Sequence, residues 1–370
     1  MVTLDFLDKF DFFTGVPDSQ LRQVCDYLVE KYSDNAKHHI IAANEGNAVA
    51  IAAGYHMATK KIPVVYMQNS GEGNAINPIA SLLNEKVYAI PMLFIIGWRG
   101  EPGVHDEPQH IFQGEITTNL LEDLNIKYFV ISKETTNADL NAKLDEFTVD
   151  LQEGKQVALI VKKGSIQYDA KVKYSNKNTI IREDAIREIV KVSGDDIVVS
   201  TTGKASRELF EIREERKESH ERDFLTVGCM GHASSIALGI ALQKSSRIWI
   251  IDGDGAALMH LGAMPILASV NPQNVVHVII NNEAHETVGG MELTAKCNYS
   301  DLAKVLGYEK TYSARDLKEL SKILDEVKET KKLTLVEIKC SIFSRSDLGR
   351  PTIKAKTNKE NFMKYLSTRK

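Results

Sequence analysis

The feature that most constrains the fold is an alternation of short apolar runs with amphipathic segments, which occurs twice along the 370 residues. In the first half the apolar runs are residues 12–16, 39–42, 63–67, 92–97, 128–132 and 157–161. In the second half they are residues 197–200, 225–227, 248–251, 275–280 and 333–338. Continuously apolar strands that alternate with helices are typical of a parallel sheet covered on both faces. The sequence therefore predicts two doubly wound α/β domains with parallel sheets.

The alternation stops between the two halves, in a polar and basic stretch at residues 162–179. We expect a linker there, because the pattern resumes only with a helical segment at 182–191. The predicted organisation is a first domain at residues 1–165, a linker at 166–180 and a second domain at 181–370. A chain of this length can form two cores, and no middle domain is expected.

Charge and apolar patterning exclude several classes of protein. A net charge of −4 argues against nucleic acid as the main partner. The N-terminus is acidic where a signal peptide needs a basic start. The most apolar stretch, residues 87–98, is too short to span a bilayer, so no membrane partner is expected. Four scattered cysteines fit a reducing compartment, and we expect a cytoplasmic protein.

Two strand ends carry the residues that most clearly indicate chemistry. The run 248–251 leads into Asp-Gly-Asp-Gly at 252–255, and the run 275–280 leads into Asn281 and Asn282. In a doubly wound domain both segments lie at the carboxyl ends of strands, where ligands bind. Glycines let the backbone approach a phosphate, and carboxylate and amide oxygens can form half of a Mg²⁺ shell. The pattern predicts a magnesium and diphosphate site.

The order strand, Gly-Asp-Gly, helix, 25 residues to the end of the next strand, and Asn-Asn resembles the diphosphate-binding domain of thiamine-diphosphate-dependent enzymes. This resemblance implies thiamine diphosphate and Mg²⁺ as cofactors, with Asp254, Asn282 and the Ala284 carbonyl as metal ligands. It also implies that Met230 is the apolar wedge under the coenzyme. The other implied cofactor-binding residues are Thr201, Gly203, Gly231, Gly253, Gly255 and Ala256.

The first half offers the carboxylate that these enzymes need. Thiamine reacts through its C2 carbanion, which forms when a buried carboxylic acid hydrogen-bonds N1′ of the coenzyme's pyrimidine. Glu45 opens an alanine-rich helix, where an isolated glutamate would only compensate the helix dipole. Its pattern E-x-x-A-x-x-x-A-x-G resembles the pyrimidine-binding domain of these enzymes. The resemblance implies that Glu45 activates the coenzyme, and that a homo-oligomer, at least a dimer, has its active sites between subunits.

Further motifs over nearly the whole chain resemble the family of phosphonopyruvate and sulfopyruvate decarboxylases, in which the middle domain is absent as well. The motifs are TGVPDS at 14–19, QNSGEGN at 68–74, GWRGEPG at 97–103, HDEPQH at 105–110, TTGKASRE at 201–208, GHAS at 231–234 and SDLGRPT at 346–352. The resemblance implies decarboxylation of 3-phosphonopyruvate to phosphonoacetaldehyde and CO₂ through the coenzyme's ylide and enamine. This reaction serves the biosynthesis of phosphonates such as 2-aminoethylphosphonate.

The motifs also contain candidate residues for proton transfer. Asp18, His105 and His110 are candidate catalytic residues, and 105–110 are expected in a Gly- and Pro-bounded loop that can close as a lid. Another interpretation is a metal site, since both histidines and the acids between them are ligand types, but their spacing matches no HExxH-like motif. A charged surface loop is the third interpretation.

The expected substrate is a small, strongly anionic 2-oxo acid, and basic residues are candidates to bind it. Arg99 and Arg350 can pair with an anionic group bidentately. Lys204 lies beside the expected diphosphate loop, where the family resemblance predicts an uncharged residue. The stretch 345–370 has eight Lys and Arg against two acidic residues. It is either a solvated helix face or a segment that helps to hold the substrate.

Two alternatives stay open for the whole chain. Within the same enzyme class, the alternative is a sulfopyruvate decarboxylase or another short 2-oxo-acid decarboxylase, because phosphonate and sulfonate differ in charge but little in shape. From a different class, the alternative is a non-catalytic α/β protein that binds a small anion. The joint presence of Glu45 and the Gly-Asp-Gly and Asn-Asn motifs favours the enzyme.

Overall fold

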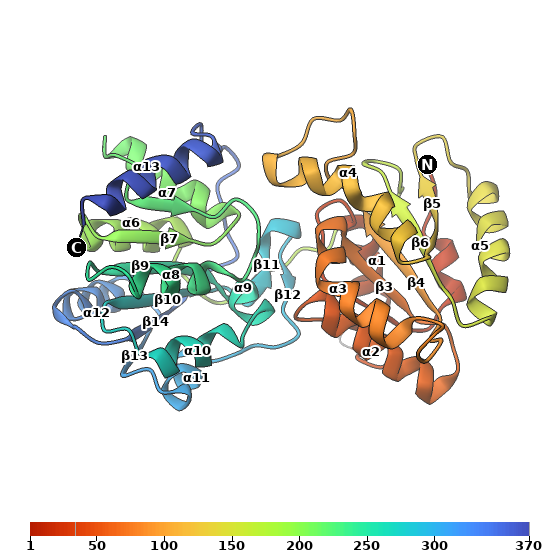
Figure 1. Cartoon of the computed structure of the whole chain (residues 1–370), viewed down its shortest axis with the longest axis horizontal. Helices are drawn as coiled ribbons and strands as arrows, with labels where there is room; N and C mark the ends of the chain where they lie inside the picture. The colour runs from red at the N-terminus through yellow and green to blue at the C-terminus, as the bar shows by residue number, and fades with distance from the viewer. Residues whose placement is uncertain (34, 370) are drawn as a thin grey trace. The chain divides into compact units, whose positions relative to one another are not determined.

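The computed structural model describes residues 1–33 and 35–369, and the chain forms two compact units, Met1–Lys173 (unit 1) and Tyr174–Lys370 (unit 2). Each unit contains a six-stranded sheet in which every neighbouring pair of strands is parallel, with helices on both faces (Figure 1). The prediction of two doubly wound α/β domains is confirmed. None of the helices in the described part of the chain is long and apolar enough to cross a bilayer.

Unit 1 has the strand order β2-β1-β3-β4-β6-β5. Its main elements are β1 (Phe13–Gly15), α1 (Arg22–Tyr32), β2 (His39–Ile41), α2 (Glu45–Thr59), β3 (Val64–Gln68), α3 (Glu72–Pro78), β4 (Met92–Gly97), α4 (Pro108–Asp123), β5 (Lys127–Ile131), α5 (Asn137–Gln152) and β6 (Gln156–Val161). The central strands β4 and β6 are buried at every position, which explains their unbroken apolar sequence.

Unit 2 has the strand order β13-β14-β10-β9-β7-β8. Its first elements are α6 (Arg182–Ser193), β7 (Ile197–Ser200), α7 (Lys204–Glu215), β8 (Asp223–Leu225), α8 (Ala233–Ala241), β9 (Ile248–Gly253), α9 (Asp254–Met259), α10 (Ala263–Val270) and β10 (Val275–Asn281). A short hairpin of β11 (Ala284–His285) and β12 (Met291–Glu292) follows. The last elements are α11 (Tyr299–Leu306), β13 (Lys310–Ala314), α12 (Leu317–Glu329), β14 (Thr334–Lys339) and α13 (Ala355–Ser367).

The two sheets have the same topology. When the six sheet strands of unit 2 are counted in chain order, both sheets are arranged second, first, third, fourth, sixth, fifth. The chain therefore reverses its winding direction between the first and third strands of each sheet, which are β1 and β3 in unit 1 and β7 and β9 in unit 2. Ligands of such sheets bind outside the carboxyl ends of the strands at this reversal.

Several elements differ from the prediction. Strand β8 begins two residues earlier than expected, because Asp223 is fully buried and paired with the buried Arg213 at 2.9 Å. Strand β13 was not expected, since it is a half-exposed edge strand with polar residues. Helix α9 begins at Asp254, inside the Gly-Asp-Gly segment, whereas the sequence pattern placed the helix after that segment. Helix α4 begins at Pro108, a favoured first helical residue, so only part of the expected lid loop is irregular.

Local contacts fix the end of β1 and the start of α2 in unit 1. Helix α2 is capped by Asn44, whose side chain accepts the Asn47 N–H at 2.9 Å. At the end of β1, a Cβ on Gly15 would lie 2.0 Å from the Tyr66 carbonyl oxygen, so only glycine allows β1 and β3 to approach here. These contacts place the first turn of α2 at the carboxyl edge of the sheet.

Candidate active site

In unit 2 the Gly-Asp-Gly and Asn-Asn segments meet at the carboxyl ends of the neighbouring strands β9 and β10. Asp254 is 4% exposed, and its Oδ1 accepts the Gly255 N–H at 2.7 Å while its Oδ2 accepts the Glu283 N–H at 2.5 Å. Burial raises the pKa of Asp254 to about 7, although backbone N–H groups oppose the rise. A bound cation would supply the positive charge that stabilises a buried, ionised carboxylate.

The two asparagines of the Asn-Asn segment have different partners. The Asn281 amide donates to Glu337 Oε1 at 2.7 Å and to the Cys297 carbonyl at 3.1 Å, so it anchors the strand end inside the fold. The Asn282 amide instead accepts the Ala284 N–H at 3.1 Å and donates to Glu286 Oε2 at 3.1 Å. Asn282 and Ala284 thus belong to one turn beside Asp254, and the three expected metal ligands lie together.

The loop after β7 has features that fit a phosphate group. Thr201 is 5% exposed, its N–H donates to the Ile251 carbonyl of β9 at 2.8 Å, and its buried hydroxyl has no hydrogen-bond partner among the described residues. Gly203 has a φ of 93° and directly precedes α7. A Cβ added to Gly253 would meet no atom within 4 Å, so the backbone is open there. An orphaned hydroxyl, a helix N-terminus and open glycine backbone suit the diphosphate.

The segment with the expected apolar wedge packs on α9. Gly231 has a φ of 88°, and a Cβ there would lie 2.7 Å from His260 Cδ2 and 2.8 Å from the Ala256 carbonyl oxygen. Glycine is therefore required for this packing. Met230 precedes it with a half-buried side chain. His232 follows and stacks on His260, with ring centroids 4.1 Å apart.

In unit 1, Glu45 is 5% exposed at the start of α2. Its carboxyl group lies against Gly71, where a Cβ would come within 2.5 Å of Glu45 Oε1. Asn74 donates to Glu45 Oε2 at 2.7 Å. Burial raises the pKa of Glu45, and the bond from Asn74 opposes this rise. A carboxyl group in this environment keeps its proton more readily than an exposed glutamate does.

Asp18 and Arg99 lie together at the same edge of unit 1. Asp18 is 2% exposed, accepts from Gln68 Nε2 at 2.5 Å, and has a pKa raised by burial while the charge of Arg99 opposes that rise. Arg99 is held by Asp106 through two bonds, Nε to Oδ2 at 2.8 Å and Nη2 to Oδ1 at 2.5 Å. Its charge is thus already matched within unit 1, which the sequence did not indicate.

The remaining candidates are spread over both units. His105 is exposed in the loop before α4, whereas His110 is half-buried in the first turn of α4. In unit 2, Arg350 is exposed, and it lies between β14 and α13. Lys204 donates to Glu286 Oε1 at 3.0 Å and to Ser344 Oγ at 2.6 Å, so it is committed to side chains of unit 2.

Two acidic residues that the sequence reasoning assigned no role have unusual environments. Glu72 is 3% exposed, and neither carboxyl oxygen has a hydrogen-bond partner among the described residues. Burial raises the pKa of Glu72 to about 9. Glu72 begins α3 after the third strand, where Asp254 begins α9 in unit 2, and both lie between glycines. The shared Gly-acid-Gly pattern could have marked Glu72 as a candidate site residue. The second acidic residue is Glu286, and no pattern in the sequence indicates a role for it.

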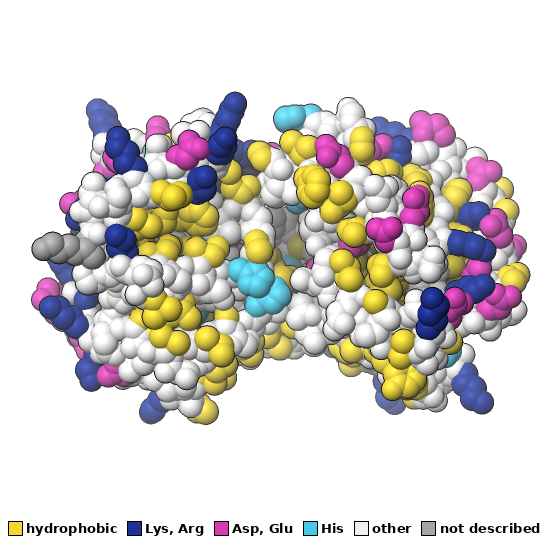
Figure 2. Space-filling view, viewed as in Figure 1, with side chains coloured by type: hydrophobic (Ala, Val, Ile, Leu, Met, Phe, Trp, Pro, Cys, Tyr) yellow, Lys and Arg dark blue, Asp and Glu magenta, His cyan; other side chains and the backbone are white. Residues whose placement is uncertain are grey.

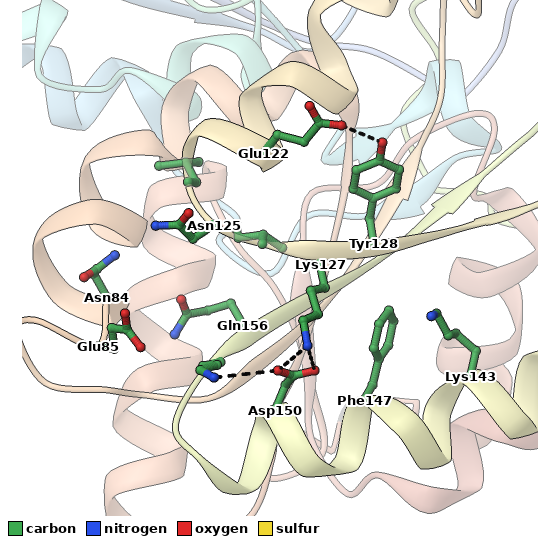
Figure 3. Close-up of a pocket in the computed structure, with 13 residues that line it drawn as sticks. Asn84, Glu85, Glu122, Asn125, Lys127, Tyr128, Lys143, Phe147, Asp150 and Gln156 are labelled. Carbon is green, nitrogen blue, oxygen red and sulfur yellow. Dashed lines mark hydrogen bonds and ion pairs between the residues drawn. The ribbon is translucent and has the colours of Figure 1, made fainter.

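A separate pocket of about 580 Å³ lies at the opposite edge of unit 1 (Figure 3). It is lined by residues at the start of β5 and β6, and several of its polar groups pair with one another. Lys127 binds Asp150 at 2.9 Å, and Tyr128 donates to Glu122 at 2.9 Å. Because the pocket lies at the start of these strands, it is away from the carboxyl ends where ligands of such sheets bind.

Known proteins resemble the chain along nearly its full length. The N-terminal TPP binding domain of thiamine pyrophosphate enzymes matches residues 3–123, and their C-terminal TPP binding domain matches residues 201–338. Phosphonopyruvate decarboxylase from Streptomyces viridochromogenes is 30% identical over 371 residues, which cover 96% of this chain and 91% of the relative. The enzyme of the same name from Streptomyces hygroscopicus is 31% identical, covering 92% of this chain and 86% of the relative.

Sulfopyruvate decarboxylase from Methanosarcina acetivorans is 25% identical over 355 residues, which cover 89% of this chain and 87% of the relative. Together with the two matched domains, these likenesses define a thiamine-diphosphate-dependent decarboxylase. Within that class, the chain belongs to the phosphonopyruvate decarboxylase family.

Proposed function

We propose that this decarboxylase converts 3-phosphonopyruvate to phosphonoacetaldehyde and CO₂, as a step in phosphonate biosynthesis. The observation that carries the proposal is the likeness to phosphonopyruvate decarboxylase, at 30% identity over 96% of the chain against 25% for the sulfopyruvate enzyme. A sulfopyruvate decarboxylase remains the second candidate, because it too matches most of the chain.

Unit 2 would hold the metal and the diphosphate. We assign the Asp254 carboxylate, the Asn282 amide oxygen and the Ala284 carbonyl to Mg²⁺, since hard cations take oxygen ligands. The open backbone at Gly253 and the backbone of Gly203, which has a φ of 93°, would receive the phosphate oxygens. When bound, thiamine diphosphate supplies the electron sink that accepts the electron pair left by the departing CO₂.

Unit 1 would supply proton transfer. Glu45 is buried with a raised pKa, so it can share a proton with N1′ of the pyrimidine. We assign Asp18 to protonation of the reacting carbon, because it is buried and hydrogen-bonded by Gln68 at the same edge of the sheet. His105 and His110 remain candidates to relay protons. Arg99, which is paired with Asp106, and Arg350 stay candidates for the substrate's anionic end.

The active form that we propose is a homo-oligomer with active sites between subunits. One surface of unit 1 supports an association. Apolar side chains gather over the N-terminal part of α4 (Figure 2), where Ile111 is 50% exposed and Phe112 is 69% exposed. Contiguous exposed apolar patches are typical of contact surfaces between proteins, whereas single exposed apolar side chains are ordinary.

The decisive experiment for the substrate is a panel of 2-oxo acids with thiamine diphosphate and Mg²⁺ added. We expect CO₂ release with 3-phosphonopyruvate to exceed that with sulfopyruvate and pyruvate by at least about 100-fold in kcat/KM, which corresponds to about 2.7 kcal/mol of discrimination. Faster turnover of sulfopyruvate would transfer the assignment to the second candidate. No CO₂ release from any of the acids would contradict the proposed function.

Replacement of Asp254 by alanine tests the metal site. We expect the affinity for Mg²⁺, measured by calorimetry with thiamine diphosphate present, to fall by at least about 100-fold, because a charged ligand is lost. Asp325 is an exposed acid on α12, and Asp325→Ala is the matched control that should bind as the unmodified protein does. Unchanged Mg²⁺ affinity in Asp254→Ala would place the metal elsewhere.

A further inference from the structure

A cluster of four charged side chains surrounds the turn that follows β10. Arg182 binds Glu208 through two bonds of 2.7 Å and also donates to Glu286. Lys204 donates to the other oxygen of Glu286 at 3.0 Å. Arg182 is 7% exposed and Glu208 is 1% exposed. Two cations thus balance two carboxylates in a largely buried site.

Glu286 is the member of this cluster that contacts a proposed metal ligand. Its Oε2 accepts the Asn282 amide N–H at 3.1 Å, while the amide oxygen of Asn282 accepts the Ala284 N–H at 3.1 Å. The partners of Glu286, which are Arg182, Lys204 and the Asn282 amide, are all donors, so its carboxyl group acts as an acceptor toward each of them.

This contact matters because an asparagine amide has two chemically different ends. Only the oxygen can bind a cation, and the NH₂ group turned toward the metal would repel it. A carboxylate can accept from the NH₂ group but cannot donate to the oxygen. Glu286 therefore selects one of the two amide orientations, and its own oxygens are occupied by Arg182 and Lys204.

We propose that Glu286 is a positioning residue that fixes the Asn282 side chain with its oxygen available to Mg²⁺. The proposal rests on the metal site of the proposed function. Residues behind the direct ligands typically change metal affinity by about 10- to 100-fold. Glutamine at position 286 could donate to the amide oxygen as well as accept from the NH₂ group, so the selection would be lost.

The test measures Mg²⁺ binding by calorimetry on the full chain with saturating thiamine diphosphate. Glu286→Gln should raise the Kd for Mg²⁺ by about 10- to 100-fold, with kcat at saturating Mg²⁺ within about twofold of the unmodified protein. Glu183→Gln is the matched control, because Glu183 pairs with Arg345 in the same unit and does not touch Asn282. Circular dichroism of each variant checks that it is folded.

A second background separates positioning from a merely structural role. Aspartate at position 282 has two equivalent oxygens and needs no orientation, so Glu286→Gln should cost no Mg²⁺ affinity in an Asn282→Asp chain. An equal loss in both backgrounds would overturn the proposal, as would unchanged affinity in Glu286→Gln alone. Loss of Mg²⁺ binding in Asp254→Ala alongside a neutral Glu286→Gln would reject only this inference, whereas a neutral Asp254→Ala would reject the site itself.

Discussion

Replacement of Glu45 by glutamine should lower kcat by about 10²- to 10⁴-fold while thiamine diphosphate still binds. Glutamine has nearly the shape of glutamate and can still accept the bond that Asn74 donates at 2.7 Å. Because its size is nearly the same, glutamine also fits the close space against Gly71. What it lacks is a proton that can move, so the effect should be on turnover rather than on binding.

The measurement pairs steady-state kcat with the calorimetric Kd for the cofactor. The control is Glu146→Gln, since Glu146 is an exposed glutamate on α5 of the same unit. It should change neither quantity. A Glu45→Gln protein with kcat near that of the unmodified protein would remove Glu45 from the reaction. A loss of cofactor binding as large as the loss of kcat would make Glu45 a binding residue instead.

The second large effect concerns stability, and it follows from Glu72. This carboxyl group is 3% exposed and unpaired among the described residues, and burial raises its pKa from 4.5 to about 9. The folded pKa is above the unfolded value, so the folded chain holds a proton that the unfolded chain releases above pH 4.5. The contribution of Glu72 to stability is therefore lost progressively as pH rises from 4.5 to about 9, at up to about 1.4 kcal/mol per pH unit.

Glutamine at position 72 cannot titrate, so Glu72→Gln should be more stable than the unmodified protein by about 2–3 kcal/mol at pH 7 and by more at pH 9. For a unit of this size, we expect the difference in Tm to be small at pH 5 and to reach at least about 10 °C at pH 9. Thermal unfolding at pH 5, 7 and 9 measures it, with the exposed Glu115→Gln as control. Equal Tm values at pH 9 would show that Glu72 is ionised or paired in the folded protein.

Most of the fold could be predicted from the sequence because the sheets are buried on both faces. Strands such as Gln156–Val161 are buried at every position and therefore have continuous apolar sequences. Lys310–Ala314 escaped prediction since an edge strand is half exposed and needs no apolar run. The register of β8 depends on the buried pair of Arg213 and Asp223, ten residues apart, and no local pattern reports such a pair.

The candidate site could be predicted as far as backbone positions are concerned. Glycines and acids at strand ends follow from topology, so Asp254 and Asn282 were expected side by side. Side-chain pairing was not predictable in the same way. Asp106 forms an ion pair with Arg99, and Glu286 forms one with Lys204. Such pairs depend on distances in the folded chain, and the spacing of the residues along the sequence does not reveal them. The unpaired state of Glu72 likewise depends on what surrounds it in three dimensions.

Each of the two six-stranded sheets is built from strands of one unit, and this affects how the protein is made. Within the described residues neither sheet borrows a strand from the other unit, so each half carries the complete set of main-chain pairings that its own sheet requires. The peptide connection between them therefore acts as a tether rather than as part of either sheet. Translation as one polypeptide fixes the two halves at a one-to-one ratio, and a short tether holds them at an effective concentration on the order of millimolar.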